Sequence, residues 1–114
     1  MLYYITSNKH KVKAAQHWLE KYNIFLKSKH FEFIEIQSES IEEIALYKAR
    51  HAFQVLHHPL VVNDAGWYIP SLRGFPGPFM KYMNDWLTND DFLRLLEPYE
   101  DRSVILREVV IYKD

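Results

Sequence analysis

One acidic residue, Asp64, lies where a carboxylate could do chemistry. It follows the apolar run Leu60–Val62 and precedes Ala65-Gly66. The run is typical of a short buried strand, and Gly66 interrupts the pattern, so we predict a loop at Asp64 between strands at 60–62 and 67–69. A carboxylate there is costly unless a cation, a metal or backbone donors face it. Sheet proteins place much of their chemistry at strand ends. A capping or turn role for Asp64 is the alternative.

A polar turn near the N-terminus could bind an anion. It comprises Thr6, Ser7, Asn8 and, three residues on, Lys11, between a predicted strand and a predicted helix. Free N–H groups and the dipole at a helix start favour an anion, and these side chains would add to that. The alternative makes Asn8 a simple N-cap and Lys11 a solvent-exposed lysine.

Lys48 is the third candidate because it occupies a slot in the apolar stripe of its predicted helix. That stripe consists of Ile41, Ile44, Ala45, Ala52, Val55 and Leu56. A lysine on an inward face needs an anionic partner or a route for its ammonium to reach water. If Lys48 points inward, it converges with the N-terminal turn on one anionic ligand. Two cations beside Glu35 and Asp64 would suit a polyphosphate with a divalent metal, and Mg²⁺ prefers such a mixed site.

The elements that must position these residues alternate between strands and helices, which predicts an α/β fold with a mixed sheet. We expect strands at 2–6, 24–27, 31–36, 60–62, 67–69 and 103–113, and helices at 9–22, 40–57, 79–86 and 88–96. Ser40-Ile41-Glu42-Glu43 has the form of a capping box. No repeat or linker interrupts residues 1–114, so we predict one domain.

Composition excludes several classes of protein. The chain has 14 basic and 15 acidic residues, a net charge of −1, which argues against bulk electrostatic binding of nucleic acid. It has no cysteine, so a disulfide framework or thiolate metal site is excluded. No apolar run reaches the ~20 residues that span a bilayer, and the start lacks signal-peptide features. A cytoplasmic protein without a membrane partner is therefore expected.

Five segments in register resemble the inosine/xanthosine triphosphate pyrophosphatase family. Residues 5–12 are similar to its opening T/S-x-N-x-x-K turn, and residues 72–79 to its L-x-G-x-P-G-x-[YF] loop. Glu35-Ile36-Gln37-Ser38-Glu39 resembles its acidic segment and Leu46-Tyr47-Lys48-Ala49 its A-L-x-K-A helix. Asn63-Asp64-Ala65-Gly66 lies where the family has two acidic residues followed by S/T-x.

The resemblance implies a shortened form of that family's fold, covering its N-terminal half. It also implies Mg²⁺-dependent hydrolysis of deaminated purine nucleoside triphosphates to a monophosphate and pyrophosphate. Site residues carried over for the triphosphate are Thr6, Ser7, Asn8, Lys11 and Lys48, with Glu35 and Asp64 as metal ligands and Asp64 also catalytic. Phe79 and Lys81 are weaker candidates for the cleft wall, and core packing is favoured for Phe79.

Two departures from the family pattern shape the alternative. Asn63 replaces an acidic residue, which removes a negative charge, and nothing matches the later F-G-Y-D-P and S-H-R segments that supply much of the base pocket. A non-catalytic nucleotide- or phosphate-binding module is therefore the second hypothesis.

The apolar strand at 103–113 indicates a homodimer if it ends the sheet, formed through these strands or through the aromatic helix around Tyr82 and Trp86. A central place in the sheet is the alternative.

Overall fold

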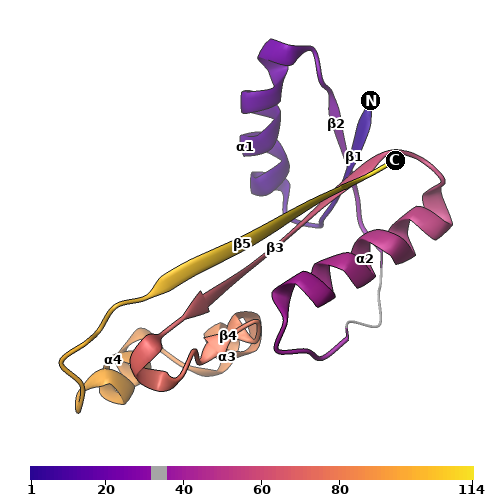
Figure 1. Ribbon diagram of the computed structural model, residues 1–114. Helices are drawn as coiled ribbons and strands as arrows, with labels where there is room; N and C mark the ends of the chain where they lie inside the picture. The colour runs from indigo at the N-terminus through magenta and orange to yellow at the C-terminus, as the bar shows by residue number, and fades with distance from the viewer. Residues whose placement is uncertain (32–35) are drawn as a thin grey trace.

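The computed structural model describes residues 1–31 and 36–114, which form a twisted mixed sheet flanked by helices (Figure 1). β2 pairs with β1, and β1 pairs with the start of one edge of β3. β4 pairs with the end of that same edge, and β5 pairs with the other edge of β3 along its whole length. β1 is parallel to β2 and β3, whereas β4 and β5 are antiparallel to β3. This confirms the predicted α/β class.

The first unit comprises β1 (Leu2–Ile5), α1 (Lys9–Leu19), a 3-10 turn (Glu20–Tyr22) and β2 (Leu26–Lys29). Asn8 caps α1 by accepting hydrogen bonds from the backbone N–H groups of His10 and Lys11. β2 begins two residues later than predicted. Asn23 adopts a left-handed conformation. The side-chain amide of Gln16 donates to the Ile24 carbonyl and accepts from the Leu26 N–H, so the residues before β2 are held against α1.

The second helix, α2 (Ile41–Leu56), covers one face of the sheet. Alanines at 45, 49 and 52 are fully or almost fully buried, and their small side chains let the helix pack closely against Leu60 and Val62. The predicted capping box is half formed: Ser40 Oγ accepts from the Glu43 N–H, but the Glu43 carboxylate binds the Ser38 hydroxyl instead of the Ser40 N–H. The helix ends at His57, as predicted, and His57 adopts a left-handed conformation there.

The prediction of two short strands around an Asp64 loop was wrong. β3 runs without interruption from Leu60 to Tyr68, and Asp64 lies at its middle, opposite Val109 of β5 (Ile105–Lys113). Gly66 was interpreted as a break, but a Cβ atom there would lie 2.7 Å from the Gly77 carbonyl oxygen. The glycine therefore allows β4 to approach β3 closely, rather than ending the strand.

The remaining elements follow β3 at the far end of the ribbon formed by β3 and β5 (Figure 1). They are a 3-10 turn (Pro70–Leu72), β4 (Pro76–Gly77), α3 (Met80–Trp86) and α4 (Asn89–Leu96). Thr88 caps α4 with a complete capping box to Asp91. Most of the strand predicted at 31–36 lies outside the described residues, and Phe31 and Ile36 are not in a strand.

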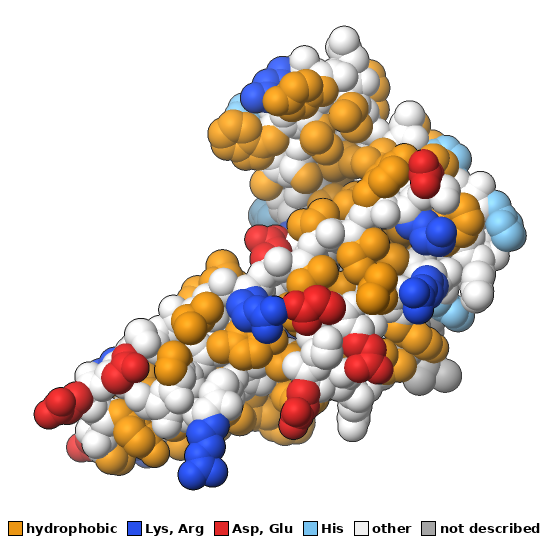
Figure 2. Space-filling model, in the orientation of Figure 1, with side chains coloured by type: hydrophobic (Ala, Val, Ile, Leu, Met, Phe, Trp, Pro, Cys, Tyr) orange, Lys and Arg blue, Asp and Glu red, His pale blue; other side chains and the backbone are white. Residues whose placement is uncertain are grey.

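The molecule is elongated, with principal extents of 49 × 31 × 20 Å. Figure 2 shows hydrophobic side chains spread over its visible face, between scattered charged groups. Over the described part of the chain, no helix combines the length and apolar character needed to cross a membrane.

Candidate active site

The candidate site lies at an open stretch of one edge of β3. On that edge β3 pairs with β1 only at Leu60 and Val61, and with β4 only at Trp67 and Tyr68. Among the described residues, no strand pairs with the stretch between them on this side. Because successive side chains of a strand point to opposite faces, Asn63 and Asp64 reach this gap from the two sides of the sheet.

Asp64 is paired with Lys48, so the anionic partner that an inward lysine requires is Asp64 itself, and not a route to water. The Lys48 Nζ donates to Asp64 Oδ1 at 2.8 Å, and the side chains are 19% and 18% exposed. α2 supplies this lysine because Ala45, Ala49 and Ala52 seat the helix on the same face of the sheet. The second carboxylate oxygen, Oδ2, is buried and makes no hydrogen bond within the described structure. A buried carboxylate oxygen without a partner calls for a cation or a donor from outside the described residues.

Asn63 lies in a short chain of polar contacts on the other face. Lys11 Nζ donates to Asn63 Oδ1 at 3.2 Å, and Asn63 Nδ2 donates to Glu108 Oε1 at 2.5 Å. Glu108 belongs to β5, where it pairs with Ala65, so it lies diagonally across from Asn63, whose own partner is Val110. The carboxylate fixes the orientation of the Asn63 amide, so that its carbonyl oxygen faces the ammonium of Lys11.

Tyr4, in β1, lies close to this network and stays protonated. Burial raises the pKa of its hydroxyl above the usual range, and the negative charges of Glu108 and Asp64 raise this pKa further. Tyr4 therefore adds a neutral side chain beside the charged groups.

A cavity of about 530 Å³ brings most of the predicted site residues together. Thr6, Ser7, Lys11, Lys48 and Asp64 line it. Asn8 is absent from the lining and serves as the N-cap of α1, as the alternative interpretation had it. Glu35 lies outside the described residues, so its role as a metal ligand stays a prediction.

Three site residues were missed by the sequence interpretation or ranked low there. His30 lines the cavity from the end of β2, and Lys81 reaches it from α3. Glu108 approaches through Asn63. Only Lys81 had a local signal, its place after the Pro/Gly loop; the other two depend on strand pairing over long sequence separations.

The lining carries an excess of positive charge, which suits an anion. Lys11, Lys48 and Lys81 face a single described carboxylate, Asp64. No group of three metal-ligating side chains occurs within residues 1–31 and 36–114. The donor set still fits Mg²⁺, which commonly binds one or two carboxylates together with water and substrate phosphates, and Asp64 Oδ2 is available for it.

Known proteins resemble this chain in sequence and in fold. The sequence profile of the Ham1 family matches residues 2–114. A dITP/XTP pyrophosphatase of Methanopyrus kandleri is 38% identical over 109 residues, covering 96% of this chain and 58% of the relative. Its counterpart in Methanothermobacter marburgensis is 37% identical over 107 residues, covering 94% of this chain and 57% of the relative. The chain therefore spans a little over half the length of these relatives.

Solved structures show the same fold. A nucleoside-triphosphatase (dITP/XTP pyrophosphatase) of Mycobacterium abscessus superposes with a TM-score of 0.68 at 18% identity, covering 98% of this chain and 69% of that one. The Staphylococcus aureus Ham1 protein gives a TM-score of 0.68 at 16% identity, covering 97% and 69%. With a profile match along nearly its whole length, the chain belongs to the Ham1 family.

Proposed function

We propose that this protein is a nucleoside triphosphate pyrophosphatase acting on deaminated purine nucleotides, such as dITP and XTP. The observation that carries the proposal is the cavity lined by three lysines and Asp64, with one oxygen of the Asp64 carboxylate making no hydrogen bond to a described residue. The names of the relatives, dITP/XTP pyrophosphatases, supply the substrate class.

In the proposed reaction, water attacks the α-phosphorus and the bond to the bridging oxygen of the α and β phosphates breaks. The products are a nucleoside monophosphate and pyrophosphate. Lys11 and Lys48 hold the triphosphate, and their fixed positive charges stabilise the charge that develops on the phosphoryl oxygens. Thr6 and Ser7 add hydroxyl donors from the turn before α1.

Asp64 has two parts in this proposal. Its Oδ2 would hold Mg²⁺, and the carboxylate would orient the attacking water, while Lys48 fixes the carboxylate through Oδ1. Mg²⁺, when bound, supplies charge neutralisation on the phosphates. Glu35 is proposed as a second ligand, on the resemblance to the family alone.

We further propose a homodimer, formed through the outer edge and exposed face of β5. Leu106, Val110 and Tyr112 are 54%, 63% and 59% exposed on one face of this strand. No described strand pairs with the outer edge of β5, so its backbone groups are available to the same edge of a second copy. The predicted cytoplasmic location stays a prediction.

The experiment is a pyrophosphate-release assay with Mg²⁺ and a panel of ITP, XTP, dITP, ATP and GTP. We expect the wild type to release pyrophosphate from the deaminated purines, and Asp64→Asn to reduce this rate at least a hundredfold. Asp90→Asn, an exposed change in α4 outside the cavity, is the matched control and should leave the rate unchanged.

Two outcomes would count against the proposal. Release that survives Asp64→Asn would mean that another residue, or a contaminant, does the chemistry. Nucleotide binding without release in the wild type would favour the binding-module hypothesis.

A further inference from the structure

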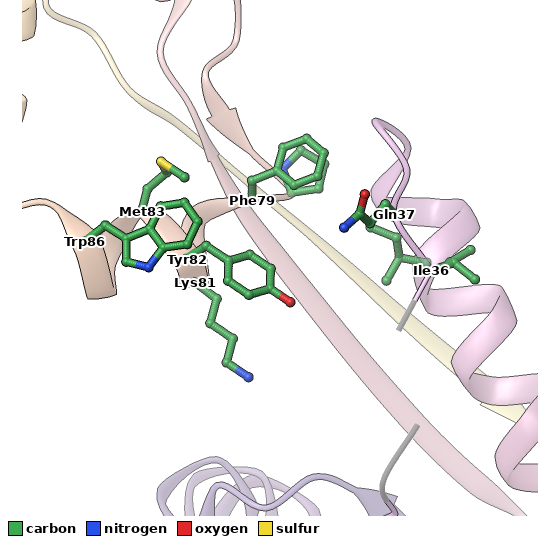
Figure 3. Close-up of a pocket in the computed structure, with 9 residues that line it drawn as sticks. Ile36, Gln37, Phe79, Lys81, Tyr82, Met83 and Trp86 are labelled. Carbon is green, nitrogen blue, oxygen red and sulfur yellow. The ribbon is translucent and has the colours of Figure 1, made fainter. Parts of the chain in front are cut away.

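A second cavity adjoins the cavity that Lys11, Lys48 and Asp64 line, which we call the phosphate cavity. It measures about 420 Å³, and Lys81 lines both cavities. Figure 3 shows Phe79, Lys81, Tyr82 and Trp86 on the side of α3, facing Ile36 and Gln37 in the segment before α2. The two cavities are therefore neighbours, with a single lysine at their boundary.

The lining of this second cavity suits a flat ring. The rings of Tyr82 and Trp86 lie 6.0 Å apart between centroids and are tilted by 41°. Tyr82 is 45% exposed and Trp86 71% exposed, so their faces are accessible to a ligand. Aromatic side chains bind nucleobases by stacking, because every base has a π-face.

Gln37 adds a hydrogen-bonding group opposite these rings. Its side-chain amide offers one acceptor and an N–H donor, which match the adjacent donor and acceptor atoms on the edge of a purine. A purely apolar ligand could form no hydrogen bond with this amide and no ionic contact with Lys81. The combination of stacking faces, one amide and a bordering cation therefore favours a nucleobase.

We propose that the cavity of Gln37, Phe79, Tyr82 and Trp86 binds the purine base of the nucleotide whose phosphates occupy the cavity of Lys11 and Lys48. This inference rests on the proposed function. Lys81, at the boundary, contacts the phosphate or ribose that joins the two parts. The chain thus carries a base subsite of its own, built from α3 and the segment before α2.

Binding experiments with three probes test the proposal. They use ITP, inorganic tripolyphosphate and inosine, without divalent ions so that the nucleotide is not consumed. We expect Tyr82→Leu and Trp86→Leu each to weaken ITP binding about tenfold, the loss of one base stack, and to leave tripolyphosphate binding unchanged. Trp18→Leu is the matched control, since Trp18 is also highly exposed (67%) but lies on α1, outside both cavities.

The indole N–H signals of the three tryptophans in an NMR spectrum report binding without depending on hydrolysis. Trp86, identified by its loss in Trp86→Leu, should shift when inosine or ITP is added, whereas Trp18 should not. The proposal is overturned if Trp86 does not respond to saturating ITP, or if the α3 variants weaken tripolyphosphate as much as ITP.

The binding data distinguish failure of the proposed function from failure of the base subsite. A wild type that binds no tripolyphosphate contradicts the phosphate site, and the Trp86 resonance with inosine still decides the base subsite. A wild type that binds tripolyphosphate and ITP equally, with Trp86 unmoved, keeps the phosphate site and rejects the base subsite.

Discussion

Asn63 and Asp64 are consecutive in β3, yet they bond to lysines from two different helices. Lys11 of α1 contacts Asn63, and Lys48 of α2 contacts Asp64. Neighbouring side chains of a strand point to opposite faces of the sheet, so each of the two residues can meet a different helix. The lysines reach them because the edge of β3 is open at that point. The carboxylate of Glu108 then lies beside Asn63 on the α1 face, so this face keeps an acidic group although position 63 has none.

At the residue scale, we predict that moving this carboxylate back to position 63 changes the metal requirement. In the double variant Asn63→Asp/Glu108→Gln the net charge is retained and a hydrogen bond between the two side chains can still form, but the carboxylate now lines the cavity, as Asn63 does. The Mg²⁺ concentration for half-maximal pyrophosphate release should fall several-fold, because one more anionic oxygen can face the metal.

One single variant is the control for this prediction. Asn63→Asp alone would bring two carboxylates into contact and should lower stability, since like charges repel at such a distance. An unchanged Mg²⁺ requirement in the double variant would contradict the prediction.

At the scale of elements, the site depends on how closely β4 approaches β3. Gly66 has no side chain where the Gly77 carbonyl passes, and Tyr68 packs nearby. The close approach positions the loop that leads into α3, and with it Lys81 and the aromatic side chains of the second cavity.

We predict that Gly66→Ala destabilises the protein by ~1–3 kcal/mol, the typical cost of forcing extra atoms into a packed site. The new Cβ would meet backbone at 2.7 Å, which cannot move aside as a flexible side chain could. Urea unfolding measures the effect. Ala65→Ser, at the exposed neighbouring position, should change the free energy of unfolding by far less, and equal effects would contradict this account.

A second element-scale prediction concerns the capping box of α4. Hydrogen bonds from the Thr88 backbone N–H and hydroxyl lower the pKa of the Asp91 carboxyl below its ordinary value of 3.8. Because the folded-state pKa is lowered, the ionised carboxylate stabilises the fold at pH values above 3.8, and this stabilisation is lost as the pH falls through the lowered pKa.

Asp91→Asn should therefore be less stable than the wild type at neutral pH, and the difference should shrink below pH 3.8. Thermal unfolding measured between neutral pH and pH 2 tests this. A difference that stays constant over the whole range would show that the charge of Asp91 has no part in the cap.

At the scale of the whole molecule, the long ribbon of β3 and β5 leaves one face poorly covered. Trp67, Leu106 and Val110 are 44%, 54% and 63% exposed on this ribbon. Extended apolar surface of this kind often marks an interaction site. A second copy could pair with β5 in antiparallel fashion about a two-fold axis, which would cover the same strand in both chains.

We predict that the wild type sediments as a dimer and that Val110→Lys shifts it towards monomer, because a charge would be buried at the interface. Val55→Lys, a change at a 55%-exposed valine on α2, is the matched control and should leave the dimer intact. A wild type that stays monomeric over a wide concentration range would contradict the homodimer.

Local sequence signals were sufficient for the helices. The cap residues Asn8 and Thr88 precede their helices where predicted, and the inward slot of Lys48 left an anionic partner or a route to water, of which the structure has the partner, Asp64. These features depend on neighbours within a few residues, so they can be derived from spacing, capping and hydrophobic periodicity. The same applies to the polar turn at Thr6 and Ser7, whose side chains line the cavity.

Tertiary structure decided the rest. The pairing of β3 with β5 over nine residues kept Asp64 inside a strand and brought Glu108 to Asn63, across 45 positions of sequence. Packing of α3 beside the segment at 36–37 created the second cavity. Strand register and helix placement arise from contacts between distant segments, which no local window contains. The sequence by itself therefore determined which residue types were available for the chemistry, and only the folded sheet determined which of them meet.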